Sequence, residues 1–218
     1  MTRAKILKFN DYSDKEYEQF RTLLSQEKLN RIDKYRHIED YRRSLLADVL
    51  ARQMLSETVH IDASELDIRV DKYGKPYVAN VSGYYFSVTH SGEYVACVVG
   101  DEPCGIDIEK IVDIELDIAK RFYSTSEYNS LVDKTDDLWI PAFFEIWTIK
   151  EAYTKLVGLG LSMELNSFEV SKRNGNYSIS NNENQEYHVT VKNWGTQYKL
   201  AIVCMNAEIE FDTAETLF

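Results

Sequence analysis

Alternating acidic residues form the first group with types and spacing that could do chemistry. In Gly105-Ile106-Asp107-Ile108-Glu109-Lys110, apolar and acidic residues alternate. On a β-strand this pattern places Asp107 and Glu109 on one face, with their backbones about 6.6 Å apart. Such a pair can bind one hard, oxygen-preferring divalent ion, because no histidine or cysteine adjoins it. A strand with a solvated acidic face is the alternative for this segment alone.

The second group is Trp147-Thr148-Ile149-Lys150-Glu151-Ala152-Tyr153-Thr154-Lys155. Glu151 and Lys155 are four residues apart, so a helix places both on one face. By itself, this spacing is also that of an ordinary ion pair on a helix surface.

The third group is Phe86-Ser87-Val88-Thr89-His90-Ser91-Gly92, a strand that leads into a tight turn. Backbone amides and hydroxyls at such a turn can face a phosphate, and the imidazole can add a hydrogen bond or a charge. A surface histidine with ordinary partners is the alternative. The segment carries no nucleophile elbow, and Gly74-Lys75 lacks the upstream glycine of a P-loop. Hydrolases of the serine type and P-loop enzymes are therefore excluded.

The hydrophobic periodicity predicts the elements that must position these groups. Helices are expected over 17–31, 39–57, 115–122, 126–131 and 138–157, and strands over 66–70, 85–89, 94–99, 105–110, 167–171, 187–191 and 198–204. Glycine turns are expected at 72–76 and 173–176, the second as an Asn-Gly hairpin.

The order helix, strand, glycine turn, strand, strand occurs twice, offset by about a hundred residues. This predicts an α+β fold of two similar α/β lobes, 1–103 and 104–218, related by a pseudo-twofold axis. A cleft between such lobes is a common place for a ligand, so we expect the active site there. Chance similarity of the element order is the alternative.

The composition limits the partners. The chain has 218 residues and a formal net charge of -11. A field of this sign repels nucleic acid and anionic membranes, and a phosphate ligand would need a metal ion or a local basic cluster. The three cysteines lack metal-site spacing, which favours free thiols in a reducing compartment. With no apparent signal sequence or membrane span, we expect a cytoplasmic protein.

In this combination and order, the segments resemble the 4'-phosphopantetheinyl transferases, of the large surfactin-synthetase-activating type. The resemblance covers nearly the whole chain and is carried by Tyr73-Gly74-Lys75-Pro76, Phe86-Ser87-Val88-Thr89-His90-Ser91, Gly105-Ile106-Asp107-Ile108-Glu109-Lys110 and Trp147-Thr148-Ile149-Lys150-Glu151-Ala152. The segments 25–28 and 43–46 also look like that type. The resemblance implies a monomer with coenzyme A in the cleft between the lobes.

The resemblance also implies roles for individual residues. Asp107, Glu109 and Glu151 would bind Mg²⁺, with Mn²⁺ as a possible substitute. Lys155 would contact the pyrophosphate of coenzyme A, and Asp107 would also contact the cofactor. Thr89 and His90 would contact its phosphates. Lys28, Arg31 and Arg43 would lie near the 3'-phosphate, and Tyr73, Gly74, Lys75 and Pro76 would border the adenine.

The activity so implied is transfer of the 4'-phosphopantetheine group from coenzyme A to a serine of an apo peptidyl or acyl carrier protein, with release of adenosine 3',5'-bisphosphate. Glu151 is the candidate base, acting directly or through a metal-bound water, and Lys155 and His90 would supply positive charge toward the leaving group. The stretch 111–131, with Phe122 and Tyr123, is the candidate docking surface for the carrier.

Two other functions remain open at this point. One is a Mg²⁺-dependent phosphohydrolase or nucleotidyl transferase that uses the same carboxylates. The other is a non-catalytic module that binds coenzyme A or a carrier protein. The residues also leave open whether the carrier belongs to nonribosomal peptide and antibiotic synthesis, polyketide synthesis or fatty acid synthesis.

Overall fold

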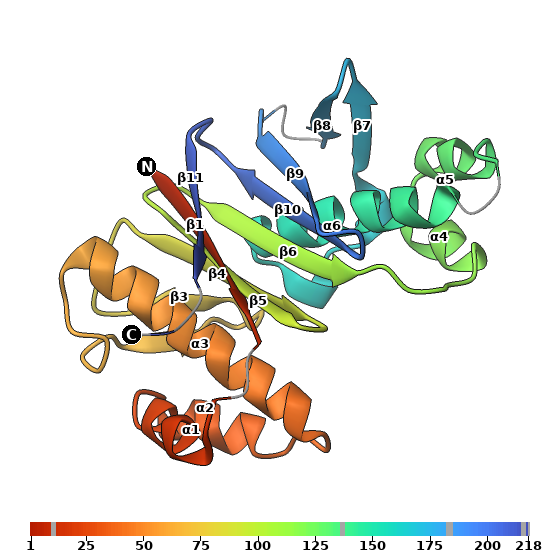
Figure 1. Cartoon of the computed structure of the whole chain (residues 1–218). Coiled ribbons are helices and arrows are strands. Elements are labelled where there is room, and N and C mark those ends of the chain that lie inside the picture. The colour runs from red at the N-terminus through yellow and green to blue at the C-terminus, as the bar shows by residue number, and fades with distance from the viewer. Residues whose placement is uncertain (10–11, 136–137, 182–184, 215–216, 218) are drawn as a thin grey trace.

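The computed structural model describes all residues except 10–11, 136–137, 182–184, 215–216 and 218. It has a mixed α+β architecture with two main sheets (Figure 1). None of the helices in the described part of the chain is long and apolar enough to cross a bilayer.

The first sheet has the strand order β11-β1-β5-β4. Its strands are β1 (Thr2–Lys8), β4 (Tyr85–Ser91), β5 (Tyr94–Gly100) and β11 (Ile209–Ala214). Strand β11 runs parallel to β1, so the C-terminal part of the chain returns to the sheet of the first half. The division at 103/104 and the pseudo-twofold axis stay predictions.

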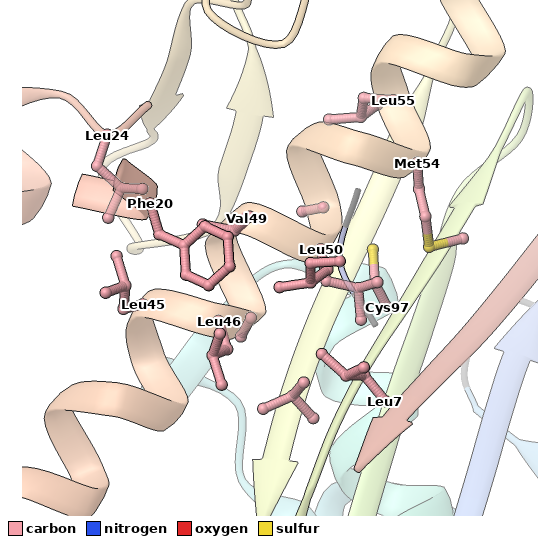
Figure 2. Close-up of a cluster of buried hydrophobic side chains, with 14 of the residues drawn as sticks. Leu7, Phe20, Leu24, Leu45, Leu46, Val49, Leu50, Met54, Leu55 and Cys97 are labelled. Carbon is pink, nitrogen blue, oxygen red and sulfur yellow. The ribbon is translucent and has the colours of Figure 1, made fainter. Parts of the chain in front are cut away.

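Helix α3 (Ile38–Val59) packs against this sheet because one side of it is apolar. Its residues Leu46 and Leu50 are fully buried. Figure 2 shows Phe20 and Leu24 beside α3, and Leu7 and Cys97 of the sheet among the same cluster. The small hairpin of β2 (Ile68–Val70) and β3 (Pro76–Val78) follows this helix in the chain.

The single helix expected over 17–31 is wrong, because the structure has two. Helix α1 (Asp14–Arg21) ends before residue 22, and α2 (Gln26–Ile32) begins after Ser25. The hydroxyl of Ser25 accepts a hydrogen bond from the backbone N–H of Lys28. This N-cap starts a new helix and places Lys28 in its first turn.

The second sheet has the order β6-β10-β9, from β6 (Cys104–Lys110), β9 (His188–Trp194) and β10 (Tyr198–Cys204). Helix α6 (Trp139–Val157) packs against β6 and β10. The short helices α4 (Asp117–Phe122) and α5 (Thr125–Val132) lie at the end of the molecule away from α3 (Figure 1).

The remaining elements connect α6 to the second sheet. Two single-turn helices, η2 (Gly160–Ser162) and η3 (Leu165–Ser167), precede the hairpin of β7 (Glu169–Arg173) and β8 (Asn176–Ser180). Asn174 and Gly175 at its tip have φ of 52° and 85°. Positive φ at both positions is what an Asn-Gly hairpin turn requires, so this prediction is confirmed.

The two sheets share a core. Ile6 and Val98 of the first sheet belong to one buried cluster with Ile106, Ile108 and Leu200 of the second. The isoleucines of β6 therefore face the other sheet, and the acidic residues between them face the opposite way. The alternation predicted for this segment is confirmed.

Candidate active site

A cavity of about 740 Å³ lies between residues of the first and second halves of the chain. The first half supplies the 73–76 turn and part of β4, and the second half supplies part of α6 and the segment that follows it. The lining includes Tyr73, Gly74, Lys75, Pro76, Phe122, Trp147, Glu151 and Lys155. Six residues that were expected to contact coenzyme A or the metal therefore lie at one cavity: Tyr73, Gly74, Lys75, Pro76, Glu151 and Lys155.

A second cavity of about 260 Å³ adjoins the first, because Gly74, Pro76, Phe86 and Val88 line both. Four cations line the second cavity: Lys28, Arg31, Arg52 and Arg69. Lys28 pairs with Asp48 at 3.3 Å, and burial lowers the pKa of Lys28. The structure thus brings together Lys28 and Arg31, and adds Arg52 and Arg69, which sequence reasoning did not select.

The acidic strand β6 lies next to α6. Asp107 is 3% exposed, and its Oδ1 accepts hydrogen bonds from Lys155 Nζ at 2.7 Å and Thr89 Oγ1 at 2.9 Å. Its Oδ2 is buried and has no hydrogen-bond partner among the described residues. Glu109 Oε2 accepts a hydrogen bond from Ser91 Oγ at 3.0 Å.

The carboxylates of Asp107, Glu109 and Glu151 influence one another. Burial raises the pKa of Asp107, and burial together with the charge of Asp107 raises the pKa of Glu109 to about 7. Burial and the charge of Asp107 also raise the pKa of Glu151. Like charges that are gathered and desolvated in this way favour binding of a cation.

These residues fit a divalent ion in type and charge. The donors are all carboxylate oxygens, which suits Mg²⁺, and the unpartnered Oδ2 of Asp107 is a free ligand atom. Among the described residues, however, no group of three or more histidine, cysteine, aspartate or glutamate side chains is positioned to hold a metal ion. That Asp107, Glu109 and Glu151 meet at one ion stays a prediction.

Comparisons with known proteins match both halves of the chain. Residues 11–102 match the family model for the N-terminal part of 4'-phosphopantetheinyl transferase, and residues 103–203 match that of the 4'-phosphopantetheinyl transferase superfamily. The chain is 40% identical to the transferase Sfp of Bacillus subtilis over 72% of this chain and 70% of that protein. The chain belongs to the 4'-phosphopantetheinyl transferase family.

Other relatives agree with this assignment. A 4'-phosphopantetheinyl transferase of Bacillus subtilis is 34% identical, with 93% of each chain covered, and gsp of Aneurinibacillus migulanus is 36% identical, with 77% of this chain and 70% of that protein covered. Among solved structures, the holo-[acyl-carrier-protein] synthase of Thermotoga maritima gives a TM-score of 0.41 at 20% identity, covering 49% of this chain and 64% of that one. The chain is a transferase of the surfactin-synthetase-activating type.

His90 of this transferase lies on β4 and is exposed. Desolvation by the surrounding chain and the charges of Lys155, Arg43 and Lys28 lower its pKa to about 4. The prediction that His90 supplies positive charge therefore requires an anionic ligand that raises this pKa again. Without one, His90 acts as a neutral hydrogen-bonding group.

Arg43 and Lys75 of the transferase are both engaged within the chain. Arg43 donates to Asp40 Oδ1 at 2.6 Å and to the carbonyl of Gly92 at 3.1 Å. Lys75 Nζ donates to the carbonyl of Leu156 at 2.6 Å, and burial lowers its pKa. Lys75 thereby joins the 73–76 turn to the C-terminal end of α6, which carries unpaired carbonyls. Their contacts to coenzyme A stay predictions.

Two structural features fix the position of α6, one against β6 and one against α5. Gly105 is required there, because a Cβ at this position would lie 1.9 Å from the carbonyl oxygen of Ala152. Lys150 and Glu127 form a fully buried ion pair of 2.8 Å between α6 and α5. Sequence reasoning missed both, although Lys150 precedes Glu151 within the same motif.

A third network joins the N-terminal half of α6 to β7, β8 and β10. Glu145 accepts hydrogen bonds from Lys199 at 2.8 Å, from Lys172 at 3.0 Å and from the hydroxyl of Tyr177. Burial by itself would raise the pKa of Glu145, but these three donors outweigh burial and hold the pKa at about 2. Glu145 is therefore ionised at neutral pH.

Proposed function

We propose that this transferase moves the 4'-phosphopantetheine group of coenzyme A onto a serine of an apo carrier protein and releases adenosine 3',5'-bisphosphate. The adjacency of the two cavities, which share four lining residues, carries the proposal. Cations line the smaller one, and Glu151 and Lys155 line the larger one next to Asp107. Coenzyme A carries a 3'-phosphate and a 5'-diphosphate on one ribose, and the two neighbouring cavities suit these two groups.

Each group of residues would contact a different part of coenzyme A or the metal ion. Lys28 and Arg31 bind the 3'-phosphate, residues 73–76 border the adenine, and Lys155 offsets charge on the pyrophosphate. Asp107, Glu109 and Glu151 would hold Mg²⁺, for which Mn²⁺ can substitute. The ion would polarise the phosphate oxygens and offset the charge that develops on them.

Group transfer requires one bond to form and one to break. The serine oxygen attacks the β-phosphorus, and the bond from this phosphorus to the oxygen of the departing adenosine 3',5'-bisphosphate breaks. The serine proton passes to Glu151, either directly or through a water. Lys155 stabilises the negative charge that the leaving group acquires.

The carrier docking surface proposed here does not include Tyr123. Tyr123 is 4% exposed and its hydroxyl donates to the carbonyl of Phe143, so its placement on the docking surface was wrong. Phe122 lines the larger cavity. The same region exposes the apolar side chains of Val112, Ile118, Val132 and Leu138. We propose that these make the apolar contacts to the carrier, since overall charge would repel an acidic partner.

Mass spectrometry of an apo carrier protein tests the proposal. Incubation with the chain, coenzyme A and Mg²⁺ should add about 340 Da, the mass of the arm, to the acceptor. Glu151→Gln should slow this by orders of magnitude and leave coenzyme A binding largely intact. Release of phosphate or nucleotide with no mass added to any carrier would favour a phosphohydrolase or nucleotidyl transferase instead.

Assembly and location complete the proposal. We expect the chain to act as a monomer, as the resemblance to the large surfactin-synthetase-activating type implies. The cysteines Cys97, Cys104 and Cys204 are buried and free, which supports a reducing compartment and hence the cytoplasm.

A further inference from the structure

A row of hydroxyl groups bridges the two sheets. Strand β4 lies at the edge of the first sheet and β6 at the edge of the second. An edge strand presents a row of backbone N–H groups without strand partners. Three such groups of β6 donate instead to side-chain hydroxyls at alternate positions of β4: Ile106 to Ser87 (3.3 Å), Ile108 to Thr89 (3.3 Å) and Lys110 to Ser91 (3.0 Å).

Two of these hydroxyls make a second bond, to the acidic side chains of β6. Thr89 Oγ1 donates to Asp107 Oδ1 at 2.9 Å, and Ser91 Oγ donates to Glu109 Oε2 at 3.0 Å. In the register of this row, Ser87 corresponds to Gly105, which has no side chain to accept a bond. Ser87 therefore only joins the two sheets, whereas Thr89 and Ser91 also bind a carboxylate.

This geometry fixes the direction of each hydroxyl proton. A hydroxyl carries one proton and two lone pairs. When a lone pair of Thr89 or Ser91 accepts the backbone N–H, the proton is left to point at the carboxylate. For Asp107, the bonds from Thr89 and Lys155 occupy Oδ1 and leave Oδ2 as the free oxygen.

We propose that Thr89 and Ser91 are positioning residues, which orient Asp107 and Glu109 as ligands of the divalent ion. They also connect this site to the hydrogen bonds that join β4 to β6. The inference rests on the proposed function and goes beyond it in one respect. It assigns Ser91 a role, and it gives Thr89 a role that precedes any contact with coenzyme A.

Manganese binding without coenzyme A is the test, because it is separate from turnover. Electron paramagnetic resonance titration should show that Ser91→Ala and Thr89→Val bind Mn²⁺ about 10- to 100-fold more weakly than the wild type, as is typical when a group that orients a metal ligand is lost. Thr89→Ser keeps the hydroxyl and should restore the affinity to within about 3-fold of the wild-type value.

Ser87→Ala is the matched control. It loses the same kind of hydrogen bond from a backbone N–H of β6, so its melting temperature should fall about as much as that of Ser91→Ala. Its Mn²⁺ affinity should stay at the wild-type value. If Ser87→Ala and Ser91→Ala lose Mn²⁺ affinity equally, or if neither does, the positioning role is wrong. Ser91→Ala decides the matter even if Thr89→Val fails to fold.

The proposed function and this inference can fail separately. A wild type that transfers the arm and binds Mn²⁺, alongside variants that bind Mn²⁺ equally well, overturns only the inference. A wild type that binds no Mn²⁺ and modifies its carrier in the presence of a chelator overturns the metal part of the proposed function and the inference with it.

Discussion

Replacing Lys150 by methionine should destabilise the fold strongly, because this lysine is the centre of a buried polar network. Its side chain is fully buried, and its Nζ donates to Glu127 at 2.8 Å and to the carbonyls of Leu165 and Phe168, each at 2.8 Å. All three ammonium protons are thus used. Methionine has a similar length and would fill the space without supplying a donor.

The magnitude follows from what Lys150→Met leaves behind. Breaking a buried ion pair by removing one partner costs about 3–5 kcal/mol, since the other charge stays buried. Glu127 keeps the N–H groups of Val170 and Ser124, each at 2.7 Å, which offsets part of the loss. We therefore expect a loss of about 3 kcal/mol in the free energy of unfolding.

Urea unfolding of four proteins measures this: wild type, Lys150→Met, Glu127→Gln and the double variant. Because Glu127→Gln removes the uncompensated charge, the double variant should be more stable than the sum of the single losses implies, by at least about 1 kcal/mol. Lys172→Met is the control, since Lys172 is 51% exposed and should cost under about 1 kcal/mol. A cost below about 1 kcal/mol for Lys150→Met, or strict additivity, would refute this reasoning.

Three further predictions follow from the site. Gly105→Ala forces the backbone of α6 away from β6 and should lower the transfer rate about 100-fold. Gly195→Ala has backbone strain at its φ of 57° but its Cβ meets no neighbouring atom, so it should leave the rate unchanged. The pKa of Glu145 is about 2 in the fold and 4.5 in the free side chain, so its ionisation contributes up to about 3 kcal/mol to the free energy of unfolding. This contribution is present above pH 4.5 and is lost as the pH falls to 2. The difference in unfolding free energy between wild type and Glu145→Gln should therefore shrink over that window, and a constant difference contradicts the assignment. Lys75→Met should lower the unfolding free energy by about 1 kcal/mol and raise the KM for coenzyme A more than it lowers kcat; an effect on kcat alone would contradict the position of Lys75 at the cofactor cavity.

Features that depend on local pattern could be predicted from the sequence. The two-residue alternation of β6, the bounds of α6 to within one residue and the Asn-Gly hairpin at Gly175 all follow from side chains near one another in the chain. The same holds for the placement of Glu151 and Lys155 on one side of α6, where both line the larger cavity.

Features that depend on distant partners were missed. Strand β11 forms only because β1, some two hundred residues earlier, offers it a free edge. Lys150 looks like an ordinary charged helix residue until α5 and η3 cover it. Arg52 looks like a solvated charge until the fold buries it, where it donates to the carbonyls of Ala63 and Leu66.

The hydroxyl row was missed although it has a signal in the sequence. Ser87, Thr89 and Ser91 alternate along β4 in step with Gly105, Asp107 and Glu109 along β6. Two matching periods of two, one of hydroxyls and one of carboxylates, indicate adjacent strands whose side chains meet.

Anomalous diffraction from crystals grown with Mn²⁺ and coenzyme A tests the central claim most directly. We predict one manganese peak about 2.2 Å from carboxylate oxygens of Asp107, Glu109 and Glu151, with the pyrophosphate of coenzyme A in contact with the ion. A manganese ion bound elsewhere, or coenzyme A bound in the cavity with Glu151 turned away from Asp107 and Glu109, would contradict the account.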